Sequence, residues 1–257
     1  MVLPYPLERV ISIDASPDTV FNFFTDPELW AKWWGTGSTI EPRAGGRLLI
    51  HHANGVEVTG EVLEVDVPNR IVFTYGYTTG TMVGQSRVTI GVEPAGGSTR
   101  VRLVHEFEEE TARDQHVQGW RHQLALLANV VTDFLHQGAP TLIDRWFAAW
   151  SSPDRDVRER TFEALATPAV RVEDRFSRFE GLEDLFGHVR AVQQFMPGIR
   201  IERRGVPRRS QWTVLADWAA VADSGEVRST GTNVFTFDGS KRIDSVIGVW
   251  DDTPRAL

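Results

Sequence analysis

Residues 11–30 have the sequence ISIDASPDTVFNFFTDPELW, in which two helix-start signals follow the end of a strand. The alternating segment Glu8–Asp14 predicts that strand. Ser16-Pro17 then supplies an N-cap serine and a proline at the first helical position. Asp26-Pro27 repeats the signal and predicts a second short helix over Glu28–Trp34. We therefore expect the fold to begin with one strand and two short helices.

A long β region follows these helices. Alternation and turn-forming residues predict five antiparallel strands, at Arg47–His52, Val56–Val65, Arg70–Tyr77, Gln85–Glu93 and Arg100–Phe107. Apolar side chains then recur at helical spacing, which predicts a long helix from Asp114 to Gln137. Such a helix would close the curved sheet into a half-barrel with a cavity between them, which is an α+β helix-grip arrangement.

The second half of the chain starts a new pattern. Gln137-Gly138-Ala139-Pro140 ends the long helix, so we expect two domains, residues 1–137 and 138–257. The predicted helices are Thr141–Ser151, Asp156–Leu165 and Glu183–Phe195, and the predicted strands are Pro168–Asp174, Ile199–Gly205, Gln211–Ala222, Val227–Phe237 and Arg242–Asp251. This order predicts an α+β cone, and we expect both domains to have antiparallel curved sheets.

The composition argues against several classes of function. A net charge of −8 disfavours a nucleic-acid partner, which needs a basic surface. The absence of cysteine excludes disulfides, thiolate catalysis and Cys-ligated zinc. Because we find neither a signal peptide nor a long apolar run, we expect a cytoplasmic protein with no membrane partner. No pattern in the sequence predicts a metal site or a phosphate-binding loop, so we expect no cofactor.

Several short motifs in the first half occur together. They are Ile13–Phe21, Thr25–Trp30, Trp33–Gly35, Gly45–Arg47, Pro68–Thr74, Gly97–Val101 and Gly119–Trp120. With them the first half resembles the START-like (SRPBCC) superfamily, in the AHSA-type branch of homologues of a heat-shock ATPase activator. The resemblance implies a ligand cavity and says little about chemistry.

A second set of motifs lies in the second half, at Asp144–Trp150, Val172–Asp174, Gly181, Gly231–Phe235, Phe237–Gly239 and Arg242–Ile243. With them the second half resembles SnoaL-like, ketosteroid-isomerase-like domains of the nuclear transport factor 2-like superfamily. The resemblance puts Asp174 at the position of the catalytic base. It puts Trp146 and Asn233 at the positions of the tyrosine and aspartate that stabilise an oxyanion. Indole and amide N–H groups are still hydrogen-bond donors, so proton abstraction next to a carbonyl is the implied chemistry.

Strand alternation supports a shared interior for these three residues. Asp174 has the same phase as Val172, and Asn233 has the same phase as Phe235, while Trp146 belongs to the apolar face of its helix. A carboxylate among apolar groups has a disfavoured charged form, which suits a general base. The alternative is that Asp174 lies at the mouth of the cone, solvated or capping a turn.

Other candidates for the second pocket are Asp217, Trp218 and Phe235. Asp217 lies on a strand with two apolar faces and could serve as a second acid, or it could lie at the rim or point outward. His188 falls on a predicted helix, where we expect a surface or rim position.

The first domain has its own candidates for ligand binding. His105 alternates in phase with Phe107 and should face the half-barrel, as should Tyr75, Tyr77, His52 and Trp120. A few polar groups in an apolar cup are typical of a small-molecule site. The alternative is that these groups are buried core residues that satisfy one another.

We therefore expect a bacterial-type protein that binds a small hydrophobic molecule, cyclic or polyketide-like. If it is an enzyme, the second domain carries cofactor-free acid–base chemistry of an isomerase or cyclase type. The alternative is a non-catalytic ligand-binding or co-chaperone-like protein whose second domain serves association, for example as a homodimer through its sheet. An open pocket with Asp174 near Trp146 and Asn233 would favour the enzyme, and a filled cone would favour binding.

Overall fold

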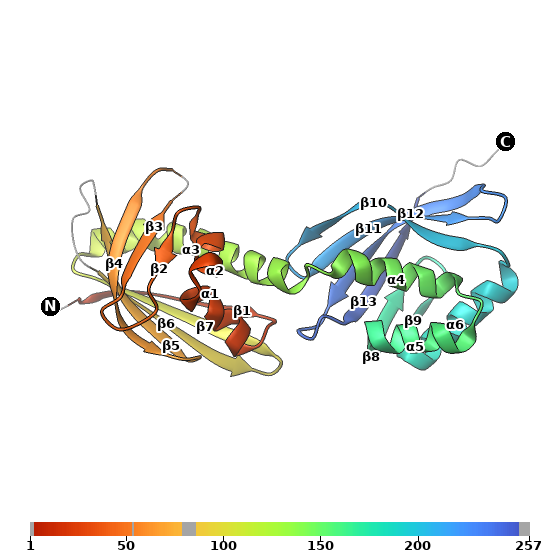
Figure 1. The fold of residues 1–257 in the computed structure, drawn as a ribbon, viewed down its shortest axis with the longest axis horizontal. Coiled ribbons are helices and arrows are strands. Elements are labelled where there is room, and N and C mark those ends of the chain that lie inside the picture. The colour runs from red at the N-terminus through yellow and green to blue at the C-terminus, as the bar shows by residue number, and fades with distance from the viewer. Residues whose placement is uncertain (1–2, 53, 79–85, 252–257) are drawn as a thin grey trace. The chain divides into compact units, whose positions relative to one another are not determined.

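A computed structural model describes residues 3–52, 54–78 and 86–251 of the chain. The chain divides into two compact units, Met1–Phe134 and Leu135–Leu257 (Figure 1). Each unit combines helices with a curved sheet, so the predicted α+β class is confirmed. The two units meet in the sequence between Phe134 and Leu135, and we propose domains of residues 1–137 and 138–257.

The first unit is built on a seven-stranded sheet with the order β1-β7-β6-β5-β4-β3-β2. The strands are β1 (Tyr5–Ile13), β2 (Thr39–Ile40), β3 (Arg47–His51), β4 (Glu57–Asp66), β5 (Arg70–Tyr77), β6 (Ser86–Ala95) and β7 (Ser98–Phe107). All neighbours in this sheet are antiparallel, as predicted. The two-residue strand β2 was not predicted, because it is too short to show alternation. The predicted start of β6 at Gln85 lies outside the described residues.

Two short helices follow β1, at the positions that the capping signals predict. They are α1 (Pro17–Thr25) and α2 (Pro27–Trp34). The Ser16 hydroxyl accepts a hydrogen bond from the amide of Thr19 at 3.2 Å. The Asp26 carboxylate accepts one from the amide of Glu28 at 2.8 Å. Both caps satisfy amides that the first turn of a helix leaves without a partner.

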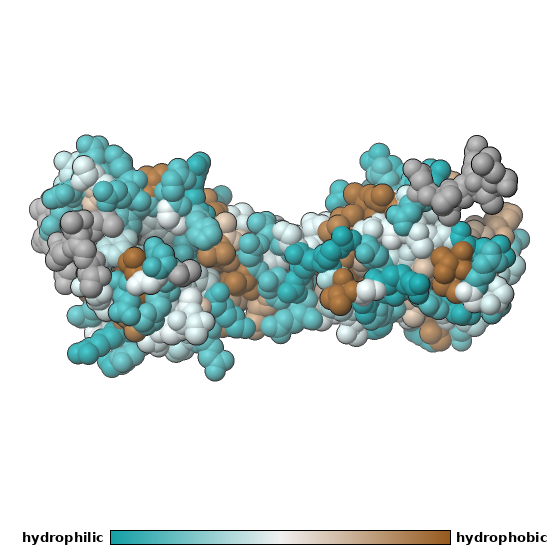
Figure 2. All heavy atoms as spheres, turned by 90° about the horizontal axis from the view of Figure 1, so that it is seen from above, coloured by the Kyte–Doolittle hydropathy of each residue, from teal (hydrophilic) through white to brown (hydrophobic). Residues whose placement is uncertain are grey.

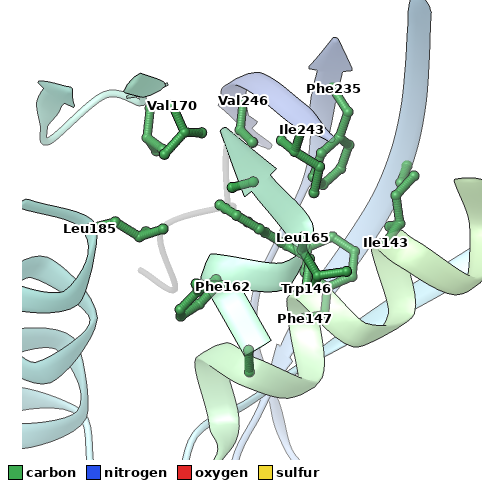
Figure 3. Packing of buried hydrophobic residues seen from close by; sticks show 14 of the residues in the cluster. Ile143, Trp146, Phe147, Phe162, Leu165, Val170, Leu185, Phe235, Ile243 and Val246 are labelled. Atoms are coloured by element: carbon green, nitrogen blue, oxygen red, sulfur yellow. The ribbon is translucent and has the colours of Figure 1, made fainter. Parts of the chain in front are cut away.

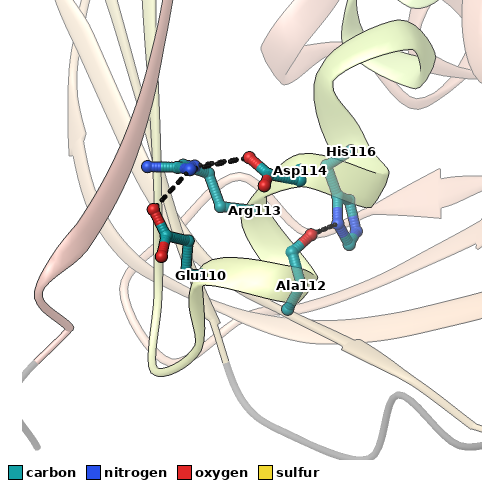
Figure 4. Close-up of polar contacts among 5 residues, drawn as sticks. All are labelled: Glu110, Ala112, Arg113, Asp114 and His116. Carbon is teal, nitrogen blue, oxygen red and sulfur yellow. Dashed lines mark hydrogen bonds and ion pairs between the residues drawn. The ribbon is translucent and has the colours of Figure 1, made fainter.

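The long helix α3 (Glu110–Leu135) begins one turn earlier than predicted. Its first turn is polar, so apolar periodicity gave no sign of it. The Arg113 guanidinium holds this turn together through Glu110 at 2.9 Å and Asp114 at 2.7 Å (Figure 4). One turn further on, His116 donates from Nδ1 to the carbonyl of Ala112 at 2.7 Å.

The core of the first unit consists of closely packed aromatic rings. Trp33 and Trp34 of α2 have ring centroids 4.3 Å apart. Trp34 also packs edge-on against Trp120 of α3, at 5.6 Å. The side-chain amide of Gln123, also on α3, donates to the carbonyl of Trp33. These contacts fix α3 against α2 over the concave side of the sheet.

The second unit is built on a six-stranded sheet with the order β10-β11-β12-β13-β8-β9. The strands are β8 (Ala166–Glu173), β9 (Arg178–Glu180), β10 (Arg200–Ser210), β11 (Thr213–Val221), β12 (Val227–Phe237) and β13 (Ile243–Trp250). The expectation of an entirely antiparallel sheet is wrong at one place, because β13 pairs with β8 in parallel. The chain passes through one helix and four strands between β8 and β13, so this pairing is not visible locally. The short strand β9 was also not predicted.

Three helices cover one face of this sheet: α4 (Ala139–Ser151), α5 (Arg155–Leu165) and α6 (Leu182–Phe195) (Figure 1). Their apolar faces and the sheet enclose the core shown in Figure 3. Trp146 and Phe147 enter it from α4, Phe162 from α5 and Leu185 from α6. Burial of these and the other apolar side chains of the core favours folding of this unit.

Hydrophilic side chains cover most of the surface that is visible in Figure 2, and hydrophobic ones form separate patches. Among the exposed apolar residues are Phe176 and Phe195, both in the second unit. No helix of the described residues has both the length and the apolar character needed to cross a membrane.

Candidate functional site

The second unit contains a pocket of about 460 Å³ between its helices and its sheet. Side chains of α4 and α6 form one wall, and β8, β10, β11, β12 and β13 form the other. Two small residues that face the pocket, Ala220 on β11 and Gly248 on β13, leave room for it. Their neighbours on the same strand faces are large, namely Trp218 and Trp250.

Aromatic rings dominate the lining of this pocket. Trp146 and Trp150 come from α4, while Trp218 and Trp250 pack edge-on against each other at 4.9 Å. Phe176 also lines the pocket and is 72% exposed, so it lies at the mouth. A pocket of this size with aromatic walls and few polar groups is suited to a small, flat, apolar molecule.

Asp174 lines the pocket directly after the end of β8. Its Oδ1 atom accepts three hydrogen bonds: from the amides of Phe176 and Ser177, both at 2.8 Å, and from the Ser177 hydroxyl at 3.0 Å. Its Oδ2 atom accepts none from the described residues. The side chain is half-buried. Asp174 therefore caps the turn between β8 and β9 and also presents a carboxylate oxygen that has no hydrogen-bond partner in the described part of the chain.

Asn233 lies beside Asp174 across strand β13. In the sheet register Asn233 of β12 faces Gly248 of β13, and Glu173, the residue before Asp174, faces the neighbouring Ile247. A Cβ atom built on Gly248 would lie 3.3 Å from Oδ1 of Asn233 and 3.2 Å from Cβ of Asp174. The glycine thus leaves open the space between the two polar side chains.

Trp146 reaches the same pocket from α4. Its ring is 1% exposed and packs edge-on against Phe162 at 4.9 Å and Phe235 at 6.2 Å. The structure therefore brings the three predicted residues Asp174, Trp146 and Asn233 to one pocket. Their catalytic roles stay predictions.

The remaining predicted residues of this unit divide between the pocket, the core and the outside. Trp218 lines the pocket, and its buried indole nitrogen has no hydrogen-bond partner among the described residues. Phe235 is fully buried in the core behind the pocket. Asp217 alternates with Trp218 and is outside the pocket lining, where its Oδ1 bonds to Arg208 at 2.7 Å and to the Thr232 hydroxyl at 2.6 Å.

His188 of α6 also lines the pocket, although the sequence suggested only a surface or rim position. Its ring lies against Phe179 at 4.9 Å and edge-on to Trp150 at 5.7 Å. Burial lowers the pKa of His188, and the negative charge of Asp174 acts in the opposite direction. Helical spacing could place His188 near Leu185 and Val189, but it could not show that this part of α6 faces an open pocket.

The predicted site residues of the first unit form a hydrogen-bonded network. The indole of Trp120 donates to Nδ1 of His105 at 2.9 Å, so that nitrogen carries no proton. His105 therefore donates from Nε2 to the Ser86 hydroxyl at 2.6 Å, and this hydroxyl donates to the carbonyl of Tyr75 at 2.7 Å. His105 is completely buried.

Two further pairs extend this network. The Tyr75 hydroxyl lies 3.2 Å from Nε2 of His52, and the Tyr77 hydroxyl lies 2.9 Å from Nε2 of His116. Because His116 donates through Nδ1 to a backbone carbonyl, its Nε2 accepts from Tyr77 in the neutral ring. His105, Tyr75, Tyr77, His52 and Trp120 thus have partners within the fold, and ligand binding by them stays a prediction.

This network makes the first unit sensitive to acid. Burial lowers the pKa of His105 well below its ordinary value, and it also lowers the pKa of His52 and of His116. Below about pH 6.5 the unfolded chain binds protons that the folded His105 does not, so stability falls as the pH falls. His105 alone should cost about 1.4 kcal/mol per pH unit while its folded ring stays neutral. Urea unfolding between pH 7 and pH 5 measures this loss.

A matched pair of variants assigns the effect. His105→Gln keeps a donor and an acceptor but does not titrate, so its pH dependence should be shallower. His122, which is exposed on α3, serves as control, and His122→Gln should leave the dependence unchanged. An equal pH dependence in His105→Gln and the wild type would contradict this account.

Among the described residues, no group of three or more His, Asp or Glu side chains is arranged to hold a metal ion.

Comparison with known protein families identifies a match for the first half of the chain. Residues 14–132 match the family of activator of Hsp90 ATPase homolog 1-like proteins. The predicted resemblance of the first half to the AHSA-type, START-like domains is thereby confirmed. None of the curated proteins matches the sequence.

Several solved structures are similar to parts of the chain. A protein of the SnoaL-like family from Agrobacterium tumefaciens is 25% identical, with a TM-score of 0.42, and the match covers 44% of this chain and 96% of that one. CalU16 from Micromonospora echinospora is 19% identical, with a TM-score of 0.43, covering 62% and 84%. The Aha1 dimer from Colwellia psychrerythraea is 20% identical, with a TM-score of 0.42, covering 48% and 91%.

Proposed function

We propose that the second unit binds a small, cyclic, largely apolar molecule and moves a proton within it, in isomerase- or cyclase-like chemistry that needs no cofactor. One observation carries this proposal: Asp174, Trp146 and Asn233 line the same aromatic pocket. A carboxylate and two N–H donors around one apolar space are the groups that enolisation of a bound ketone requires.

In the proposed reaction, Oδ2 of Asp174 takes a proton from the carbon next to a carbonyl group. The electron pair of the broken C–H bond moves toward the carbonyl oxygen, which becomes an enolate. N–H groups of Trp146 and Asn233 stabilise the negative oxygen by hydrogen bonding. Where the ligand has a double bond between the β and γ carbons, the enolate is a dienolate and the Asp174 carboxyl group returns the proton to the γ carbon. The double bond then lies between the α and β carbons, so the ligand is isomerised and no co-reactant is consumed.

A second candidate function is ligand binding without catalysis. The three hydrogen bonds to Oδ1 favour it, because they give the Asp174 carboxylate a structural role in the turn after β8. Under this alternative, the same pocket holds its ligand and Asp174 serves only to fix the turn.

Proton exchange separates the two functions. With 2-tetralone in D₂O, the wild-type protein should accelerate deuterium incorporation next to the carbonyl, which NMR measures directly. Asp174→Asn should lower the rate of the protein-catalysed exchange by about 10²- to 10⁴-fold, the usual contribution of a general base. The asparagine keeps an oxygen for the three turn hydrogen bonds, so the fold should be retained.

Asp217→Asn is the matched control, because Asp217 is a carboxylate of the same unit that lies outside the pocket lining. It should leave the exchange rate unchanged. Equal rates for Asp174→Asn and the wild type would remove Asp174 as the base. A wild-type protein that binds 2-tetralone without accelerating exchange would favour the binding function.

Two further parts of the proposal concern location and assembly. We place the protein in the cytoplasm, and we propose a homodimer through the sheet of the second unit. Cell fractionation checks the first and sedimentation of the purified chain checks the second.

A further inference from the structure

His188 is the one imidazole among the described residues that line the pocket, and its ring is held by apolar contacts alone. Phe179 lies against it with the two rings tilted by 33°, and Trp150 meets it edge-on at 77°. Neither ring nitrogen of His188 forms a hydrogen bond with the described residues. The side chain is thus fixed in place while its hydrogen-bonding capacity remains unused by the fold.

The charges around the pocket restrict what His188 can bind. Asp174 and Glu173 line the pocket at the end of β8, and no Lys or Arg of the described residues lines it. Glu173 is paired with Arg178 at 3.7 Å, but Asp174 has no ion-pair partner among the described residues. A ligand carboxylate or phosphate would therefore approach the Asp174 carboxylate without a cation to offset it. The lining favours an uncharged ligand.

The chemistry of the unused groups indicates what such a ligand carries. Oδ2 of Asp174 can only accept a hydrogen bond, and an imidazole that is not protonated accepts through one nitrogen. Burial lowers the pKa of His188, so its ring is uncharged at neutral pH and keeps a free lone pair. A ligand hydroxyl group, which donates a single hydrogen bond, can donate to either of these acceptors.

We propose that His188 is the hydroxyl-binding residue of this pocket: one ring nitrogen accepts a hydrogen bond from the phenolic or enolic hydroxyl of an uncharged, flat aromatic ligand. The ligand rings lie among Trp146, Trp150, Trp218 and Trp250. The charge of Asp174 strengthens His188 as an acceptor. This inference rests on the proposed function only in placing the ligand in the same pocket, and it requires no catalysis.

Binding of three naphthalene derivatives to the full chain tests the proposal. 2-Naphthol presents a hydroxyl, 2-methoxynaphthalene has the same rings without the donor, and 2-naphthoate is an anion. Isothermal titration should show 2-naphthol binding about tenfold more tightly than 2-methoxynaphthalene, the effect of one hydrogen bond. 2-Naphthoate should bind most weakly. In NMR spectra of the wild type, 2-naphthol should shift a ring nitrogen of His188, and 2-methoxynaphthalene should not.

His188→Phe keeps an aromatic ring beside Phe179 and Trp150 but cannot accept the hydrogen bond. It should bind 2-naphthol and 2-methoxynaphthalene equally, and the exposed His122→Phe of α3 should behave as the wild type. The proposal would be overturned if His188→Phe still bound 2-naphthol more tightly than 2-methoxynaphthalene. It would also be overturned if the wild type bound 2-naphthoate more tightly than 2-naphthol, or if it bound neither of the two neutral naphthalenes. If His188→Phe does not fold, an unshifted His188 nitrogen in the wild type with 2-naphthol would overturn it. Binding through His188 without deuterium exchange would overturn the proposed isomerisation and leave this inference standing.

Discussion

Replacing Trp146 by alanine should lower the free energy of unfolding of the second unit by about 3–5 kcal/mol, the usual cost of removing a buried tryptophan ring. The ring is 1% exposed and contacts Phe162 and Phe235 edge-on, so it connects α4 to α5 and to β12. Alanine would forfeit these contacts and leave a void that opens onto the pocket. Urea unfolding, monitored through hydrogen exchange of the β12 amides, measures the loss of stability within the second unit.

Trp146→Phe separates the packing of this residue from its proposed role as a donor. Phenylalanine retains an aromatic ring, so the loss of stability should be much smaller than for alanine. It removes the indole N–H, so deuterium exchange of 2-tetralone should still slow if Trp146 stabilises the enolate. A loss below about 1 kcal/mol for Trp146→Ala would show that the ring is not part of the core.

Features of the fold that depend on neighbouring residues could be predicted from the sequence. The starts of α1 and α2 follow from Ser16 and Asp26, because a capping side chain bonds within three residues of itself. The first turn of α3 could not be predicted in this way, because its ion pairs on Arg113 leave no apolar pattern. The parallel pairing of β8 with β13 depends on strands about 75 residues apart, which no local signal reports.

The candidate site shows the same limit. Alternation predicted that Asn233 faces inward, and Asn233 lines the pocket. It left both Asp217 and Trp218 as candidates, although adjacent residues of a strand point to opposite faces, and only Trp218 lines the pocket. It could not show that Asp174 ends its strand and caps a turn, because that depends on the backbone of Phe176 and Ser177. His188 was missed as a pocket residue, because its ring contacts come from two other elements, β9 and α4, whose packing against α6 has no local signal. Residues that line a cavity formed by several elements can be recognised only once those elements are assembled.

Gly231→Ala should also destabilise the second unit strongly. Gly231 lies on β12 between β11 and β13, and a Cβ atom there would lie 2.3 Å from the carbonyl oxygen of Val249. The same atom would lie 2.7 Å from the ring of Trp218, which forms the pocket wall. The backbone of β13 cannot move without breaking its pairing, so we expect a loss of about 3 kcal/mol, at the upper end for overpacking. Unfolding followed through the β12 amides measures it.

Gly187→Ala is the matched control, because it makes the same chemical change in the same unit with the opposite expected sign. Gly187 lies within α6, and a Cβ atom built there meets no atom within 4 Å. Alanine should therefore raise stability by about 0.5–1 kcal/mol through its helix propensity. If Gly231→Ala were as stable as the wild type, β12 and β13 would have to be further apart than the structure places them. In that case Trp218 would not be fixed as a wall of the pocket, because the contact that holds its ring over Gly231 would be absent.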